Sequence, residues 1–133
     1  MAPYFHTVQY YETDKMGIVH HANYIRWMEE ARVYMLEQMG YPFDRIEREG
    51  LVCPTVAVSF EYKSSTTFPD RVAIAPRVSS FNGVHVEITY EMTCGDRLVG
   101  IGMSRHVFSE AATGRISRLR RDHPELYELL SNG

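Results

Sequence analysis

The sequence predicts an α+β fold in which a curved antiparallel sheet wraps around one long helix. Three observations predict it: a broad apolar helical arc over residues 22–39, alternating apolar and polar residues in most of the segment 51–108, and short turn signals between those strands. Strands joined by hairpin turns pair antiparallel, whereas a doubly wound sheet would need a helix after each strand. The single long helix must therefore bury its apolar side against the sheet.

The amino-terminal third predicts a strand followed by the helix. Residues 4–10 alternate and predict a first strand, and the polar, irregular residues 11–21 lead into the helix. Gly40 and Pro42 are typical of a helix end, and a short helical turn is expected over residues 43–49. The apolar arc is wider than a flat sheet would cover, so we expect the sheet to curl around it. The arc comprises Tyr24, Ile25, Trp27, Met28, Ala31, Tyr34, Met35, Leu36 and Met39.

The later strands are punctuated by turn residues. The clearest strand spans residues 84–92, between the turn signals Asn82-Gly83 and Gly95-Asp96. Pro76 interrupts the preceding strand and indicates an edge or a bulge. Gly100 and Gly102 share one face of the last strand, over residues 97–108, which indicates a bend or the close approach of a neighbour. A short helix is expected after Pro124.

Length and composition restrict the class of protein. A chain of 133 residues predicts one domain over residues 1–133, and its 44% hydrophobic content is ordinary for an ordered globular protein. A net charge of −3 argues against general nucleic-acid binding, which usually requires a basic stripe. Cys53 and Cys94 are far apart and are expected to be buried free thiols. With no secretory signal and no apolar run of ~20 residues, we expect a cytoplasmic protein without a membrane partner.

The segment from Tyr10 to Tyr24 carries the most specific motif, Tyr-Tyr-Glu-Thr-Asp-Lys-Met-Gly-Ile-Val-His-His-Ala-Asn-Tyr. It resembles the signature of the 4-hydroxybenzoyl-CoA thioesterase-like branch of the hotdog superfamily. In that signature an Asp after a Thr or Cys ends the first strand, and a Gly, an apolar pair and the start of the central helix follow. Here these positions are Asp14, Gly17, Ile18-Val19 and Ala22-Asn23-Tyr24. The segments 27–32 and 60–63 also look like the family's helix and one of its strands.

The resemblance implies a hotdog fold, hydrolysis of an acyl-CoA thioester and assembly as a homodimer or homotetramer with sites at the subunit interface. Thioester hydrolysis needs a carboxylate that attacks the carbonyl carbon or activates a water, and donors directed at the carbonyl oxygen. Asp14 precedes the helix, whose unpaired N-terminal N–H groups are such donors, and Gly17 permits an unusual backbone path between them. The resemblance implies that the backbone N–H of His21 holds the oxyanion. Asp14 as nucleophile and Asp14 as general base both remain open, and a plain turn residue is the alternative.

Further site residues are expected on the helix. Tyr24 is a candidate for the wall of the acyl pocket. Glu29 and Arg32 stand three residues apart and are expected to form a half-buried ion pair. Glu29 is also an alternative site carboxylate, because other hotdog branches place theirs on the central helix. The His20-His21 pair lacks the spacing of metal ligands, so no metal is expected, and the His21 side chain is expected to shape the pocket or assist Asp14 as a base.

Coenzyme A carries several negative charges that need cations or helix ends. Lys63 and Arg118 are candidates to bind them, and no cofactor is expected because coenzyme A is part of the substrate. A serine-nucleophile elbow and a phosphate-binding loop are both missing from the sequence. Two alternatives remain: a hydratase acting on acyl thioesters, and a non-catalytic acyl-CoA-binding protein. Aromatic, short-chain and medium-chain acyl groups are all open.

Overall fold

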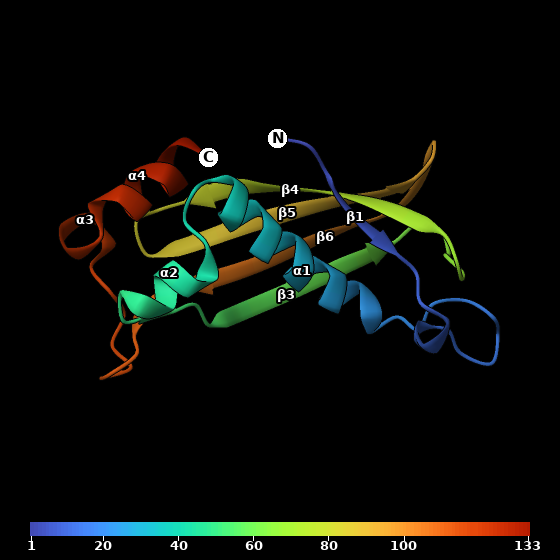
Figure 1. The fold of residues 1–133 in the computed structure, drawn as a ribbon, viewed down its shortest axis with the longest axis horizontal. Coiled ribbons are helices and arrows are strands. Elements are labelled where there is room, and N and C mark those ends of the chain that lie inside the picture. The colour runs from blue at the N-terminus through green and yellow to red at the C-terminus, as the bar shows by residue number, and fades with distance from the viewer.

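The computed structural model describes residues 1–133 and shows a five-stranded antiparallel sheet that curves around α1 (Figure 1). The strand order is β1-β4-β5-β6-β3, and two further short strands, β2 and β7, pair with each other. This is the predicted hotdog architecture. The strands of the main sheet are β1 Tyr4–Thr7, β3 Thr55–Tyr62, β4 Arg71–Phe81, β5 His85–Cys94 and β6 Arg97–Val107; the small pair is β2 Leu51–Val52 and β7 Ser109–Glu110.

The central helix α1 spans Asn23–Gln38, one residue shorter at each end than the sequence predicts. Gly40 then adopts a positive φ of 86°, as expected for a helix stop, and α2 (Phe43–Arg48) occupies the predicted helical turn. Ile25 departs from the predicted apolar arc, because 36% of it is exposed. The buried positions of α1 are Tyr24, Trp27, Met28, Ala31, Arg32, Met35 and Leu36.

The inner face of the sheet is built by period-2 alternation. In β5, Val86, Ile88, Tyr90 and Met92 are all buried in the core cluster that includes α1. His85 and Glu91 alternate with them and are exposed on the opposite face. The predicted strand is confirmed, except that it begins at His85 and not at Val84 and ends at Cys94 and not at Met92.

Gly100 and Gly102 allow α1 and β3 to lie close to β6. A Cβ at Gly100 would stand 2.6 Å from the Glu61 carbonyl oxygen, and a Cβ at Gly102 would stand 2.7 Å from the Met28 sulfur. Real Cβ atoms do not approach neighbours so closely, so the close approach expected from the sequence is confirmed.

Three features differ from, or add to, the expected elements. The first strand ends at Thr7 and not at residue 10, because Tyr10–Glu12 form the 3-10 turn η1. Pro76 lies beyond the residues of β4 that pair with β1, so β4 is at the edge of the sheet there. A register shift between Val78 and Ser80 follows, which is the expected bulge. The chain ends with α3 (Leu119–Asp122), which the sequence did not predict, and α4 (Pro124–Asn132), which it did. None of these helices has the length and apolar content that crossing a membrane requires.

Candidate functional site

The motif segment folds as a tight hairpin between η1 and α1. Thr13 and Val19 form an antiparallel bridge, and the Asp14 N–H donates to the Ile18 carbonyl at 2.9 Å. Gly17 closes the turn with a positive φ of 78°, which a residue with a side chain rarely adopts. Asp14 is half-buried, and its Oδ1 accepts the Met16 N–H at 2.8 Å. Its Oδ2 has no hydrogen-bond partner within the chain, so one carboxylate oxygen is available to a ligand.

A buried carboxylate that the sequence did not predict anchors this hairpin. Glu12 is 5% exposed, and its two carboxylate oxygens accept three hydrogen bonds: at 2.8 Å from His6 Nε2, at 2.8 Å from the Gln9 N–H and at 2.7 Å from Trp27 Nε1. Its backbone carbonyl accepts two more, from the His20 N–H and from the side chain of Asn23, each at 2.9 Å. Glu12 therefore links β1, the hairpin and the first turns of α1.

The start of α1 leaves one backbone donor free beside this hairpin. The Ala22 N–H donates to His20 Nδ1 at 3.2 Å, and the Asn23 N–H donates to the His20 carbonyl at 3.0 Å. The His21 N–H has no acceptor within the chain. A free N–H at a helix N-terminus carries part of the positive end of the helix dipole, so this group can hold a developing negative charge.

A cavity of about 260 Å³ opens next to His21. Tyr24 forms part of its wall: the Tyr24 ring is stacked on Phe60 with centroids 5.1 Å apart, and its hydroxyl is 2.8 Å from Thr66 Oγ1. Asp14 adjoins the cavity through Ile18, its hydrogen-bonded neighbour. The lining residues are Ile18, Val19, His21, Tyr24, Tyr62, Lys63, Ser64 and Ser65. The structure thus brings His21, Tyr24 and Lys63 together around this cavity, whereas Asp14 is not among the residues that line it.

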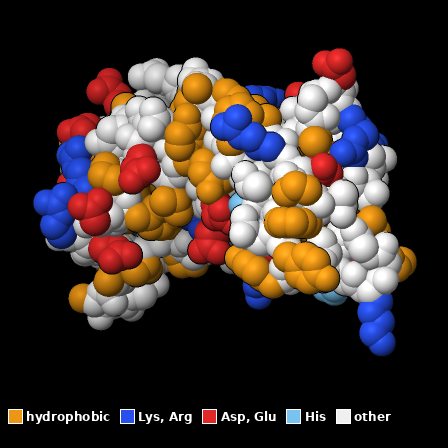
Figure 2. All heavy atoms as spheres, turned by 45° about the vertical axis from the view of Figure 1, so that its right-hand side comes forward, with side chains coloured by type: hydrophobic (Ala, Val, Ile, Leu, Met, Phe, Trp, Pro, Cys, Tyr) orange, Lys and Arg blue, Asp and Glu red, His pale blue; other side chains and the backbone are white.

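The His21 side chain and Lys63 face the outside of this cavity. The His21 imidazole is exposed and stacks on His20 with ring centroids 4.3 Å apart. Lys63 Nζ is 3.3 Å from a carboxylate oxygen of Glu61, and both side chains are exposed. A solvated cation at the mouth of a cavity is accessible to an anionic ligand. Figure 2 turns this end of the molecule toward the viewer and shows hydrophobic side chains in separate groups with charged ones between them.

Two of the predicted site residues, Glu29 and Arg118, do not line the His21 cavity. The expected Glu29–Arg32 ion pair is wrong: no carboxylate lies within 4.0 Å of Arg32, which turns inward and donates to Cys53 Sγ at 3.5 Å. Arg118 lines a different cavity with Gly83, beside the β4–β5 turn. That turn is the far end of the sheet from Tyr62, since residues 85 and 92 of β5 are roughly 23 Å apart at ~3.3 Å per residue. Within one chain, Arg118 and Lys63 do not share a site.

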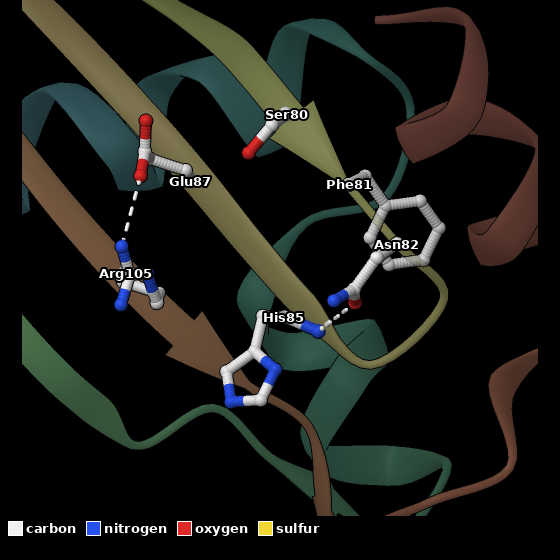
Figure 3. A pocket seen from close by; sticks show the side chains of 6 residues that line it. All are labelled: Ser80, Phe81, Asn82, His85, Glu87 and Arg105. Atoms are coloured by element: carbon white, nitrogen blue, oxygen red, sulfur yellow. Dashed lines mark hydrogen bonds and ion pairs between the residues drawn. The ribbon is translucent and has the colours of Figure 1, made fainter.

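Another cavity, of about 330 Å³, lies on the outer face of the sheet (Figure 3). Three of the polar side chains that line it already have partners: Arg105 donates to Glu87 at 3.3 Å, and the Asn82 side chain accepts the His85 N–H at 2.7 Å. It lies at the β4–β5 end with no group of the motif segment in its wall. We therefore place the candidate site at His21.

The sequence pattern of the thioesterase-like superfamily matches residues 8–129. YneP of Bacillus subtilis strain 168, a candidate acyl-CoA thioesterase, is 32% identical over 85 residues, which are 64% of this chain and 62% of YneP. A candidate esterase of Aquifex aeolicus is 42% identical over 67 residues, 50% of this chain and 52% of its own. The matches thus span about half to six tenths of these relatives. The crystal structure of a DHNA-CoA thioesterase from Staphylococcus aureus superimposes with a TM-score of 0.91 at 26% identity, over 96% of this chain and 87% of the other.

Proposed function

The chain belongs to the thioesterase-like superfamily, and from that premise we propose that it hydrolyses an acyl-CoA thioester to a carboxylic acid and free coenzyme A. The observation that carries the proposal is the unpaired His21 N–H at the start of α1, on the same hairpin as Asp14 with its free carboxylate oxygen. A carboxylate and an oxyanion donor are the two groups that acyl transfer needs. The proposed reaction uses these groups and water, with no metal or cofactor.

The proposed reaction begins with the thioester carbonyl oxygen on the His21 N–H. In one route Asp14 Oδ2 attacks the carbonyl carbon, the coenzyme A thiolate leaves, and water then hydrolyses the resulting mixed anhydride to the carboxylic acid and free Asp14. In the other route Asp14 removes a proton from a water that attacks the carbonyl carbon, and passes that proton to the departing thiolate. In both routes the N–H at the helix end holds the negative charge that develops on the carbonyl oxygen. In other enzymes, removing one such donor raises the reaction barrier by roughly 3 kcal/mol. Lys63 is proposed to contact a phosphate of coenzyme A from the cavity mouth.

We further propose that the active form is a homodimer or homotetramer. β3 is an edge strand of eight residues, and it exposes Val56, Val58 and Tyr62. A long edge strand with exposed apolar side chains is suited to pairing with another chain, and a second copy of this chain would lie next to the His21 cavity, which Tyr62 lines. The two free thiols, Cys53 and Cys94, suit a reducing compartment, so a cytoplasmic location remains part of the proposal.

Replacing Asp14 with Asn tests the chemistry. Asp14→Asn keeps the Met16 hydrogen bond but removes the nucleophile or base, so thiol release from acyl-CoA esters should fall about 10²–10⁴-fold. Binding of a non-hydrolysable thioether analogue should be unchanged. Asp96→Asn, in the exposed turn between β5 and β6, is the matched control and should retain full turnover. Near-normal turnover by Asp14→Asn would remove Asp14 from the mechanism. Binding without thiol release by the wild-type protein would instead favour a non-catalytic acyl-CoA-binding protein.

A further inference from the structure

A second cavity, of about 230 Å³, lies next to the His21 cavity between the same two elements. The His21 cavity is lined by Tyr24 of α1 and by His21 just before the helix, and the second cavity by residues 25, 28, 29 and 32 of α1. On β3 the order matches: Tyr62 lines the first cavity, and Val58 and Thr55 line the second. The two cavities therefore follow one another along the space between α1 and β3. The second is lined by Ile25, Met28, Glu29, Arg32, Thr55, Val58, Tyr90, Ser104 and His106.

Arg32 brings an unpaired positive charge into this second cavity. The residue is 7% exposed, and its guanidinium contacts only the Cys53 sulfur, at 3.5 Å, and the ring of Phe43, at 5.2 Å from the centroid. Glu29 is exposed and lines the same cavity without forming an ion pair with Arg32. A buried charge without an opposite charge is costly, so a group in this position is suited to an anionic ligand that completes it.

The remaining polar groups of the wall are neutral and bonded to each other. The Tyr90 hydroxyl is 2.7 Å from Ser104 Oγ, which is 2.7 Å from His106 Nε2, and His106 Nδ1 is 3.1 Å from the Thr55 hydroxyl. Burial, together with the charge of Arg32, lowers the pKa of His106 to about 4, so the imidazole is neutral at pH 7. Burial also raises the pKa of Tyr90 to about 12. Glu29 is thus the one carboxylate in the wall of the cavity, and it does not pair with Arg32.

We propose that this cavity is the subsite for the far end of the acyl group, and that it takes a carboxylate there. The inference rests on the proposed function: the thioester carbonyl would lie at the His21 N–H, and the acyl chain would run along α1 to Arg32. From Asn23, where α1 begins, to Arg32 the helix rises roughly 14 Å, and side chains lean toward the helix N-terminus, which shortens the path. A planar guanidinium matches a carboxylate with two parallel hydrogen bonds. The substrate class is therefore an ω-carboxyacyl-CoA.

Matched substrates test this with the wild-type protein. Thiol release is measured for a series of ω-carboxyacyl-CoA esters of increasing chain length and for the methyl ester of each, which carries no charge and is one methyl group larger. We expect the acid of the best length to exceed its methyl ester at least ~10-fold in kcat/KM, because the ester leaves Arg32 unpaired. Arg32→Gln should abolish that preference while Arg32→Lys retains part of it. Glu29→Gln should raise the preference, because it removes a negative charge from the cavity.

Binding separates the failure of this inference from the failure of the proposed function. Calorimetry with the thioether analogues of the acid and of the methyl ester gives their affinities independently of turnover. Turnover of acid and ester at equal kcat/KM would overturn the carboxylate subsite and leave thioester hydrolysis intact. Tighter binding of the acid analogue without any thiol release would support the subsite and overturn hydrolysis. If Arg32→Gln does not fold, the wild-type comparison and Glu29→Gln still decide the question.

Discussion

The carboxylate of Glu12 accepts hydrogen bonds from three separate parts of the chain: β1, η1 and α1. Burial raises the pKa of Glu12, but the hydrogen bonds from the Gln9 backbone, His6 and Trp27 outweigh burial and hold the pKa below its usual value. The ionised form is therefore the one that fits this position. Because the carbonyl of the same residue holds His20 and Asn23, Glu12 also sets where the hairpin meets the helix.

Glu12→Gln is expected to destabilise the fold by about 2–3 kcal/mol, because an amide has one acceptor oxygen and its NH2 group would face donors. The measurement is the free energy of unfolding from urea denaturation at pH 7. Glu37→Gln, an exposed carboxylate on α1, is the control and should change stability by less than about 0.5 kcal/mol. Equal stability of the two variants would show that the Glu12 network is not needed to hold the hairpin.

Single residues also show what local sequence cannot predict. Glu29 and Arg32 have the spacing of an ion pair, yet Arg32 turns toward Cys53, which lies 21 residues further along the chain. Of the three donors to Glu12, the Gln9 N–H is only three residues away, but His6 lies in β1 and Trp27 in α1. Such partners are set by packing of distant segments, so spacing rules that compare near neighbours miss them. Asp14 and His21 were predicted as site residues because the signature of a family specifies them, and they remain a prediction.

At the scale of elements, the contact of β6 with β3 and α1 depends on two glycines. Gly100→Ala would place a methyl group against the backbone carbonyl of Glu61, which cannot move without shifting β3. Gly102→Ala would press on the Met28 thioether, which is flexible. We therefore expect Gly100→Ala to cost about 2–3 kcal/mol and Gly102→Ala about 1 kcal/mol, measured by urea unfolding. The opposite order, or no loss in either, would contradict the close packing between these elements.

Helices and strands whose apolar pattern repeats over many residues were predicted well, and elements of only a few residues were not. α1 and β5 each extend over ten or more residues, and their observed bounds lie within two residues of those that the sequence predicts. η1, α3 and the β2–β7 pair contain two to four residues per element, too few to show a period. These short elements form where nearby residues provide hydrogen-bond partners. The Gln9 N–H, for example, donates to the Glu12 carboxylate, and the first strand ends before it.

For the whole molecule, the position of both α1 cavities beside β3 links catalysis to assembly. β6 covers one side of β3, and the other side is the open edge of the sheet. A second copy that paired along this edge would lie next to the cavities that contain His21 and Arg32. Assembly would then exclude water from the thioester, which strengthens the interaction of the His21 N–H with the oxyanion.

Val56→Lys tests this arrangement. Val56 is 51% exposed on β3, and a lysine on an edge strand opposes pairing with another chain, so the variant should be a monomer where the wild-type protein is a dimer or tetramer. Sedimentation equilibrium gives the mass, and thiol release by the same sample should fall at least ~10-fold if the interface completes the site. Val33→Lys, a comparable exposed valine on α1, is the control for added charge. A monomeric variant with unchanged turnover would place the complete site within one chain, and an unchanged mass would move the interface away from β3.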